Sequence, residues 1–278
     1  MENSNQIKNM VRQKYSEIAL QGKATNQSSC CGAGSCSTEV YNIMSDDYST
    51  LEGYNAEADL GLGCGLPTQF ARINKGDTVI DLGSGAGNDC FVARKETGAD
   101  GRVIGIDFTP AMIDKAKANA QKAGFANVEF RLGELEDVPV SANIADVIVS
   151  NCVLNLVPNK HKVFSEIFRV LKPGGHFSIS DVVLVGNLPA ALYNAAEMYA
   201  GCVSGAIQKE VYLELIEAQG FTNITLQKEK PIIIPDDILH NYLDTDSLAA
   251  FKASNTGIFS LTVYAEKAKD CGCAPGCC

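Results

Sequence analysis

The stretch from Asp77 to Asp107 reads DTVIDLGSGAGNDCFVARKETGADGRVIGID, and it decides the fold. It opens with the apolar run Thr78–Leu82, which has the length and composition of a buried strand. Glycines at positions 83, 85 and 87 follow, and then a helix-like segment over 90–95. A second apolar run over 103–106 ends in Asp107. Strand, glycine turn, helix, strand and acid, in this order, predict a nucleotide-binding βαβ unit.

The two acids at the strand ends indicate what this unit binds. Asp107 stands at the tip of the second strand, where an acid can accept hydrogen bonds from both hydroxyls of a ribose. Asp81 stands just before the first glycine, where its charge would repel a pyrophosphate but suit a positively charged amino group. The glycines let the backbone approach a ligand closely. A dehydrogenase, or a Rossmann variant without a ligand, is the alternative interpretation.

The run DLGSGAGND resembles the first motif of the class I S-adenosylmethionine-dependent methyltransferases. That resemblance implies a set of cofactor-binding residues: Asp81, Gly83 and Gly85 for the methionine moiety, Asp107 for the ribose, Met112 against the adenine, and Glu134 at the adenine edge with Asn151 nearby.

The composition of the 278 residues narrows the classes of partner. The net charge is −10 and no basic stripe is present, so we expect no nucleic-acid partner. The longest apolar runs are too short for a membrane span, and the N-terminal MENSNQIKNMVRQ lacks a signal-peptide core. We therefore expect a cytoplasmic protein without a membrane partner.

Strand-like and helix-like segments alternate along the chain, which predicts an α/β fold with a doubly wound Rossmann-like sheet. We expect an N-terminal helix and cysteine-bearing loop over 1–60, then a cofactor-binding core over 61–184. We expect residues 185–268 to form a smaller α+β region and residues 269–278 to form a disordered cysteine-rich tail.

Eleven cysteines are many for a chain without an export signal, and they stand at positions 30, 31, 36, 64, 90, 152, 202, 271, 273, 277 and 278. In a reducing compartment such a set indicates metal or metalloid binding or redox chemistry before structural disulfides. Only three histidines accompany them. The available ligands are thus almost entirely thiolates, which select soft ions.

Three of these cysteines stand where a ligand cleft is expected. Cys64 and Cys202 lie among glycines or other small residues, and Cys152 follows a strand end. Zinc sites normally show close C-x-x-C pairs, which these three lack. Three converging thiolates would suit trivalent arsenic, whose lone pair can attack a sulfonium methyl group. A buried apolar role, a zinc site or redox regulation remain alternatives, and for Cys90, inside the first helix, we expect a buried inert thiol.

Six segments resemble the arsenite S-adenosylmethionine methyltransferases: YNAEADLGLGCGLP, DLGSGAGNDC, SNCVLNLVP, RVLKPGG, SDV and GCVSGA. This resemblance spans roughly residues 10 to 265. It implies that Cys64, Cys152 and Cys202 bind arsenic, and that an N-terminal cysteine joins a disulfide relay. Cys30, Cys31 and Cys36 compete for that last role, and we favour Cys31.

On this basis we expect a monomeric enzyme acting on arsenite and methylarsenite, with S-adenosylmethionine as donor and no permanent metal. Thioredoxin or a small thiol would act as the reductant. Two alternatives are a C- or O-methyltransferase of a small metabolite and a thiol-rich metalloid-binding protein without turnover. The role of the C-terminal cysteines stays open between arsenite capture and a passive soft-metal tail.

Overall fold

The computed structural model describes residues 2–20, 46–189, 191–192, 205–234, 236–254 and 256–269. Cys30, Cys31, Cys36, Cys202 and the cysteines of the expected tail lie outside these residues. The helices are α1 (Glu2–Leu20), η1 (Tyr48–Thr50), α3 (Pro67–Phe70), α4 (Asn88–Thr97), α5 (Pro110–Ala123), η2 (Leu154–Leu156), α6 (Lys160–Val170), α8 (Lys209–Glu217), α9 (Asp236–Leu239) and α10 (Thr245–Ala253). The strands are β1 (Thr78–Leu82), β2 (Arg102–Asp107), β3 (Val128–Leu132), β4 (Ala145–Asn151), β5 (Leu171–Val185), β6 (Phe221–Ile232) and β7 (Gly257–Lys267).

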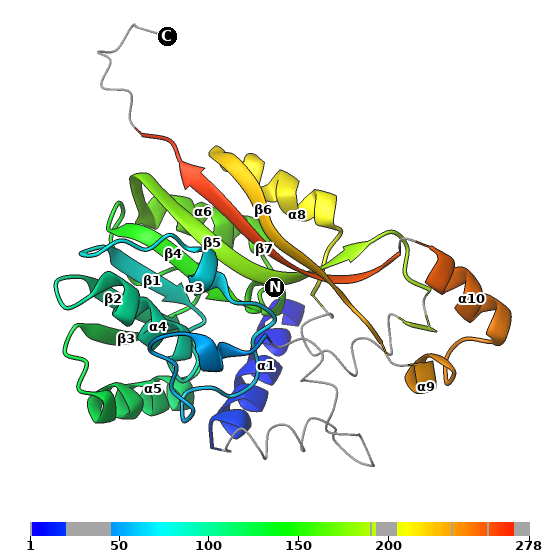
Figure 1. The fold of residues 1–278 in the computed structure, drawn as a ribbon, viewed down its shortest axis with the longest axis horizontal. Coiled ribbons are helices and arrows are strands. Elements are labelled where there is room, and N and C mark those ends of the chain that lie inside the picture. The colour runs from blue at the N-terminus through cyan, green and yellow to red at the C-terminus, as the bar shows by residue number, and fades with distance from the viewer. Residues whose placement is uncertain are drawn as a thin grey trace, which may run out of the picture.

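These strands form one sheet in the order β3-β2-β1-β4-β5-β7-β6 (Figure 1). Strands β1 to β5 run parallel, and β7 lies antiparallel between β5 and β6. The chain moves outward from β1 to β3 and then returns to the other side of β1 with β4. In open α/β sheets, ligands bind beyond the carboxyl ends of the strands at such a reversal. The topology therefore places a binding crevice between the ends of β1 and β4.

Alternating side chains cover the two faces of the sheet with separate cores. Ile80, Ile104 and Ile148 belong to the core beneath α6 and α8, whereas their neighbours Val79, Val103 and Val147 belong to the core beneath α4 and α5. Successive strand residues point to opposite faces, and the central strands β1, β2 and β4 carry buried apolar residues on both, as expected for a sheet covered by helices. The predicted doubly wound Rossmann-like fold is confirmed.

The C-terminal part continues this sheet. We expected residues 185–268 to form a smaller α+β region. Its strand β7 pairs with β5, and its strand β6 pairs with β7. Strand β5 extends over Leu171–Val185, and β7 pairs with it from His176 to Val185. Helices α9 and α10 form a lobe beyond the long strands, with a small core of its own (Figure 1).

Among the described helices, none combines the length and the apolar composition that crossing a bilayer requires.

Candidate active site

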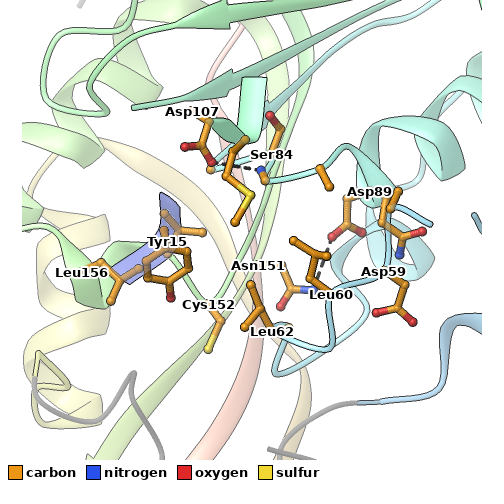
Figure 2. A pocket seen from close by; sticks show the side chains of 18 of the residues that line it. Tyr15, Asp59, Leu60, Leu62, Ser84, Asp89, Asp107, Asn151, Cys152 and Leu156 are labelled. Atoms are coloured by element: carbon orange, nitrogen blue, oxygen red, sulfur yellow. Dashed lines mark hydrogen bonds between the residues drawn. The ribbon is translucent and has the colours of Figure 1, made fainter. Parts of the chain in front are cut away.

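A cavity opens at the carboxyl ends of β1, β2 and β4, where the strand order reverses (Figure 2). Its walls come from the turn after β1, the residues after β2 and β4, the segment 58–63, and Tyr15 of α1. The empty volume is about 710 Å³, including the open mouth.

The glycine turn after β1 forms one wall. Gly83 has a φ of +75°, and a Cβ there would lie 2.4 Å from the Val153 side chain, so both conformation and space require glycine. Gly85 has a φ of +50° and open space where a Cβ would stand. Between them, the buried Ser84 hydroxyl has no hydrogen-bond partner among the described residues. The wall therefore offers a polar group and room for a ligand.

Asp107 closes the end of β2 and lines the cavity. Its Oδ2 accepts the Gly85 N–H at 3.0 Å, and its Oδ1 accepts the Thr109 N–H at 2.8 Å. Burial raises the pKa of Asp107, while these backbone hydrogen bonds act in the opposite direction. Its carboxylate is thus held in a fixed orientation at the position expected for a ribose partner.

Asp81 lies behind the cavity wall and is not one of the lining residues. It is 2% exposed, and burial raises its pKa well above the ordinary value, with the charge of Asp89 adding to the effect. The Cys90 thiol donates to Asp81 Oδ2 at 3.2 Å, and burial raises the pKa of this thiol too, so it stays protonated as a donor. Cys90 is fully buried, as expected.

Met112 is fully buried and lines the cavity, whereas Glu134 lines a smaller apolar pocket that adjoins it. Lys8 of α1 donates to Glu134 Oε2 at 2.7 Å and also pairs with Glu136. The helix α1 is thus attached by ion pairs at the edge of the region expected to hold adenine.

Two of the predicted arsenic ligands, Cys64 and Cys152, lie in one buried cluster with Val182, Leu184 and Ile258. Neither thiol forms a disulfide with another described cysteine, and Cys152 lines the cavity (Figure 2). Cys152 has a φ of +60°, an uncommon conformation for a residue other than glycine, and its N–H donates to the Ser180 carbonyl at 2.8 Å. Strained residues of this kind cluster at functional sites.

Asn151 lines the cavity beside Cys152, and its amide also bonds to the Cys64 segment. The third predicted ligand, Cys202, and Cys31 lie outside the described residues. Within the described part of the chain, no three His, Cys, Asp or Glu side chains gather closely enough to hold a metal ion.

The sequence did not point to several polar residues of the cavity, among them Tyr48, Asp59 and Asp89. Asp89 stands two residues after Gly87 in the first turn of α4, and this proximity to the glycine turn is the signal that could have found it. Tyr48 and Asp59 come from a segment without periodicity. Only the folded chain brings them to the cavity.

The profile of the methyltransferase-domain family matches residues 73–220. An arsenite methyltransferase from Halobacterium salinarum is 42% identical over 238 residues, which cover 80% of this chain and 59% of that protein. One from Aquipseudomonas alcaligenes is 34% identical over 270 residues, covering 94% of this chain and 75% of that protein. The solved arsenic(III) S-adenosylmethionine methyltransferase from Chlamydomonas reinhardtii superposes with a TM-score of 0.63 at 31% identity, over 82% of this chain and 73% of that one. This chain therefore spans only part of the length of each of these relatives.

Proposed function

The chain belongs to the arsenite methyltransferase family, and we propose that it transfers the methyl group of S-adenosylmethionine to trivalent arsenic held by its cysteine thiolates. One observation carries the proposal. Two thiols from distant parts of the chain, Cys64 and Cys152, share a buried cluster, and one of them lines the cavity that Asp107 and the glycine turn enclose.

The cavity suits S-adenosylmethionine, which supplies an electrophilic methyl group on a sulfonium centre. The unpartnered Ser84 hydroxyl and the open space beside Gly85 leave room for a polar ligand there. Asp107 would accept hydrogen bonds from its ribose, and Met112 would pack on its adenine. Asp59 and Asp89 add negative charge to the same cavity, which favours a cationic ligand.

The thiols would bind arsenite by exchange, each As–OH bond being replaced by an As–S bond with release of water. Cys64 and Cys152 would supply two sulfurs and Cys202 the third. Ala206 packs in the same cluster as both described thiols, and Gly205 lies against the Asn155 carbonyl. Cys202 precedes Gly205 by three residues, which span at most about 11 Å of extended chain. This short span supports Cys202 as the third ligand in the proposal.

No general base is needed, because arsenic uses its own lone pair and loses no proton. The role of the chain is to hold the lone pair in line with the methyl–sulfur bond. Transfer raises arsenic from the trivalent to the pentavalent state, so its return requires two electrons. Two chain thiols, with Cys31 favoured as one, would supply them by forming a disulfide. Thioredoxin or a small thiol would then reduce that disulfide.

The test is thiol-dependent transfer of labelled methyl groups from S-adenosylmethionine to arsenite and methylarsenite, separated by chromatography with arsenic-specific detection. We expect methylated arsenicals with the wild-type chain and none with Cys152→Ser, whose hydroxyl stays protonated and is a hard ligand. Quinones and other small metabolites serve as control acceptors. Labelling of these metabolites but not of arsenite would favour the C- or O-methyltransferase alternative, and binding of arsenite without turnover would favour a metalloid-binding protein.

A further inference from the structure

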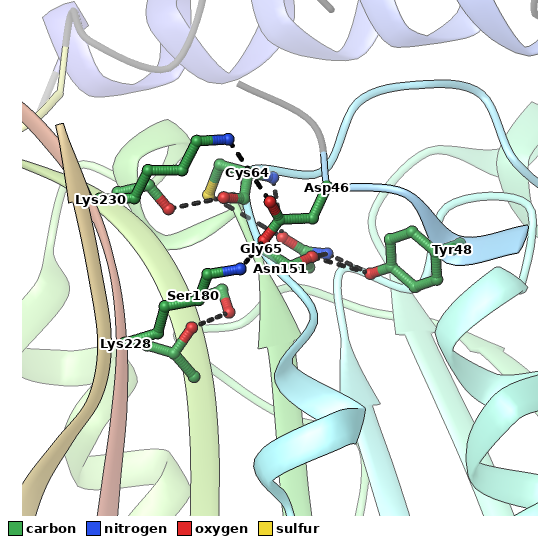
Figure 3. A network of polar contacts seen from close by, with 10 residues as sticks. Asp46, Tyr48, Cys64, Gly65, Asn151, Ser180, Lys228 and Lys230 are labelled. Atoms are coloured by element: carbon green, nitrogen blue, oxygen red, sulfur yellow. Dashed lines mark hydrogen bonds and ion pairs between the residues drawn. The ribbon is translucent and has the colours of Figure 1, made fainter. Parts of the chain in front are cut away.

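The side-chain amide of Asn151, at the end of β4, forms hydrogen bonds with the segment that carries Cys64 (Figure 3). Its Oδ1 accepts the Cys64 N–H at 3.0 Å, and its Nδ2 donates to the Gly65 carbonyl at 2.8 Å. A Cβ on Gly63 would lie 2.6 Å from the same Nδ2, so the turn is seated directly against the amide. On the other side of this turn, the Ser260 hydroxyl donates to the Cys64 carbonyl at 2.5 Å.

The same amide connects this turn to the cofactor cavity. Nδ2 also donates to the Tyr48 hydroxyl, and that hydroxyl lies 2.8 Å and 3.0 Å from the two carboxylate oxygens of Asp89. Tyr48 is 6% exposed, and Asp89 lines the cavity. A hydrogen bond from a neutral donor to a carboxylate is of the stronger kind. Tyr48 therefore links a fixed carboxylate of the cavity to the amide that holds Cys64.

Tyr48 itself is held in place from two sides. Asp47 caps the short helix η1 by accepting the Ser49 N–H at 2.9 Å. Asp46 pairs with Lys228 at 2.6 Å and with Lys230 at 3.4 Å, which attaches this segment to β6 (Figure 3). The Tyr48 hydroxyl thus reaches Asn151 from an anchored segment and not from a freely moving one.

We propose that Tyr48 and Asn151 are positioning residues, whose hydrogen bonds hold the Cys64 thiol at the arsenic site at a set distance from the methyl donor. The proposal rests on the proposed function, in which arsenite needs three thiolates and methylarsenite two. Releasing Cys64 should then slow the methylation of arsenite and spare that of methylarsenite.

Tyr48→Phe tests this with the smallest change, because it removes the hydroxyl and keeps the buried ring. Loss of one hydrogen bond to a carboxylate should slow arsenite methylation by about tenfold. At saturating S-adenosylmethionine, the ratio of the arsenite rate to the methylarsenite rate should fall by about tenfold. A change passed to the cofactor cavity through Asp89 acts on both substrates alike, whereas Cys64 is not one of the two methylarsenite ligands. Tyr264→Phe is the matched control, because its hydroxyl donates to Glu266 at 2.7 Å on β7 and is not part of the network.

A second measurement needs no turnover. Cys64 and Cys90 are both fully buried, so their alkylation by iodoacetamide, followed peptide by peptide with mass spectrometry, reports local opening at each. In Tyr48→Phe we expect Cys64 to be alkylated faster than in the wild type, and Cys90 to be alkylated at the wild-type rate. Faster alkylation of both Cys64 and Cys90 would assign Tyr48 a role in folding alone and overturn the proposal. Wild-type alkylation of Cys64 would overturn it too, as would equal slowing of arsenite and methylarsenite methylation. If the wild-type chain did not methylate arsenite, the proposed function would fail, whereas the alkylation comparison would still decide whether the network holds Cys64.

Discussion

Three buried or partly buried carboxylates, those of Asp81, Asp89 and Asp107, gather at the ends of β1 and β2 and at the start of α4. The pKa of each is raised, with burial as the largest cause, and Asp89 reaches about 6. Like charges in a low-dielectric site raise one another's pKa values. A ligand that brings positive charge relieves this repulsion, which is why such a cavity suits a cationic cofactor.

The affinity for S-adenosylmethionine should therefore depend on pH through Asp89. An ionised Asp89 attracts the cation and a protonated one does not, so affinity should fall as the pH drops below about 6, the pKa of this carboxyl. When one proton is linked to binding, the affinity changes by at most about tenfold per pH unit. Isothermal titration between pH 5 and 8 measures it. Asp89→Asn should bind more weakly and lose the part of the pH dependence that is centred near pH 6, and an unchanged pH profile in that variant would remove Asp89 from the cofactor site.

Asp107→Ala should weaken cofactor binding and leave the binding of trivalent arsenicals nearly intact. Two charge-assisted hydrogen bonds to the ribose would be lost, at a cost of roughly 2–3 kcal/mol. Because Asp107 also accepts the Gly85 and Thr109 N–H groups, Asp107→Asn is a second variant that retains one acceptor oxygen. Asp114→Ala, an exposed acid on α5, is the control. Wild-type affinity in both Asp107 variants would contradict the assignment of this acid.

At the scale of the elements, the length of β5 brings a buried acid, Asp181, beneath α8. The carboxyl is fully buried and lies 3.4 Å from the Tyr212 hydroxyl. Burial raises the pKa of Asp181 to about 7, and Lys160 acts against the shift. The strand continues past this acid because β7 pairs with it to Val185.

Asp181→Asn should stabilise the protein at pH 8. The ordinary pKa of this carboxyl is 3.8, so the folded state holds its proton more tightly than the unfolded state does. The stabilisation of the folded state by the protonated Asp181 carboxyl is therefore fully present below pH 4 and is lost as the pH rises towards 7. At pH 8 the wild-type chain keeps a buried charge that asparagine lacks, while asparagine can still accept the Val182 N–H. Calorimetry from pH 4.5 to 8.5 should show a higher Tm for the variant at pH 8, by roughly 2–4 °C for each kcal/mol gained in the free energy of unfolding. That difference should shrink towards pH 4.5, and equal melting curves at pH 8 would contradict the prediction.

Much of the fold followed from local patterns, since the run over 78–82, the glycine turn and the acid at position 107 each carry their own signal. The doubly wound sheet was predicted from the alternation of strand-like and helix-like segments, and the family from the resemblance of six segments to it. Both are confirmed. The pairing of β7 with β5 and of β6 with β7 was not predicted, because the local sequence of a strand does not indicate its partner in the sheet. The same holds for Tyr48, whose contacts with Asp89 and Asn151 span 41 and 103 positions of sequence. Such contacts exist only in the folded chain.

At the scale of the whole molecule, one end of the sheet collects segments from four parts of the chain. The turn at Cys64, the glycine turn, the end of β4 and the residues around Ala206 meet there. Parallel strands make this possible because their carboxyl ends share one edge, so that residues far apart in sequence become neighbours. The site therefore depends on the complete sheet. Cysteines that lie in the same cluster need not take part in the same methylation step.

A matrix of cysteine variants against the two substrates separates those steps. Arsenite would use three thiolates, whereas methylarsenite already carries one carbon and has two positions left. If Cys152 and Cys202 fill those two positions, replacing either with serine should abolish methylation of both substrates, because a protonated hydroxyl is a hard ligand that does not replace an As–S bond. Cys64→Ser and Cys31→Ser should abolish methylation of arsenite only.

Removal of residues 270–278 is the control in this matrix, because it takes away four cysteines that lie outside the described fold. The rate at saturating arsenite should be unchanged, since capture by a tail would matter only when arsenite is scarce. Products are measured by chromatography with arsenic-specific detection. If Cys152→Ser methylated methylarsenite at the wild-type rate, the cysteine after β4 would be a packing residue of its apolar cluster. Complete loss of activity on removing the tail would instead show that those cysteines belong to the site.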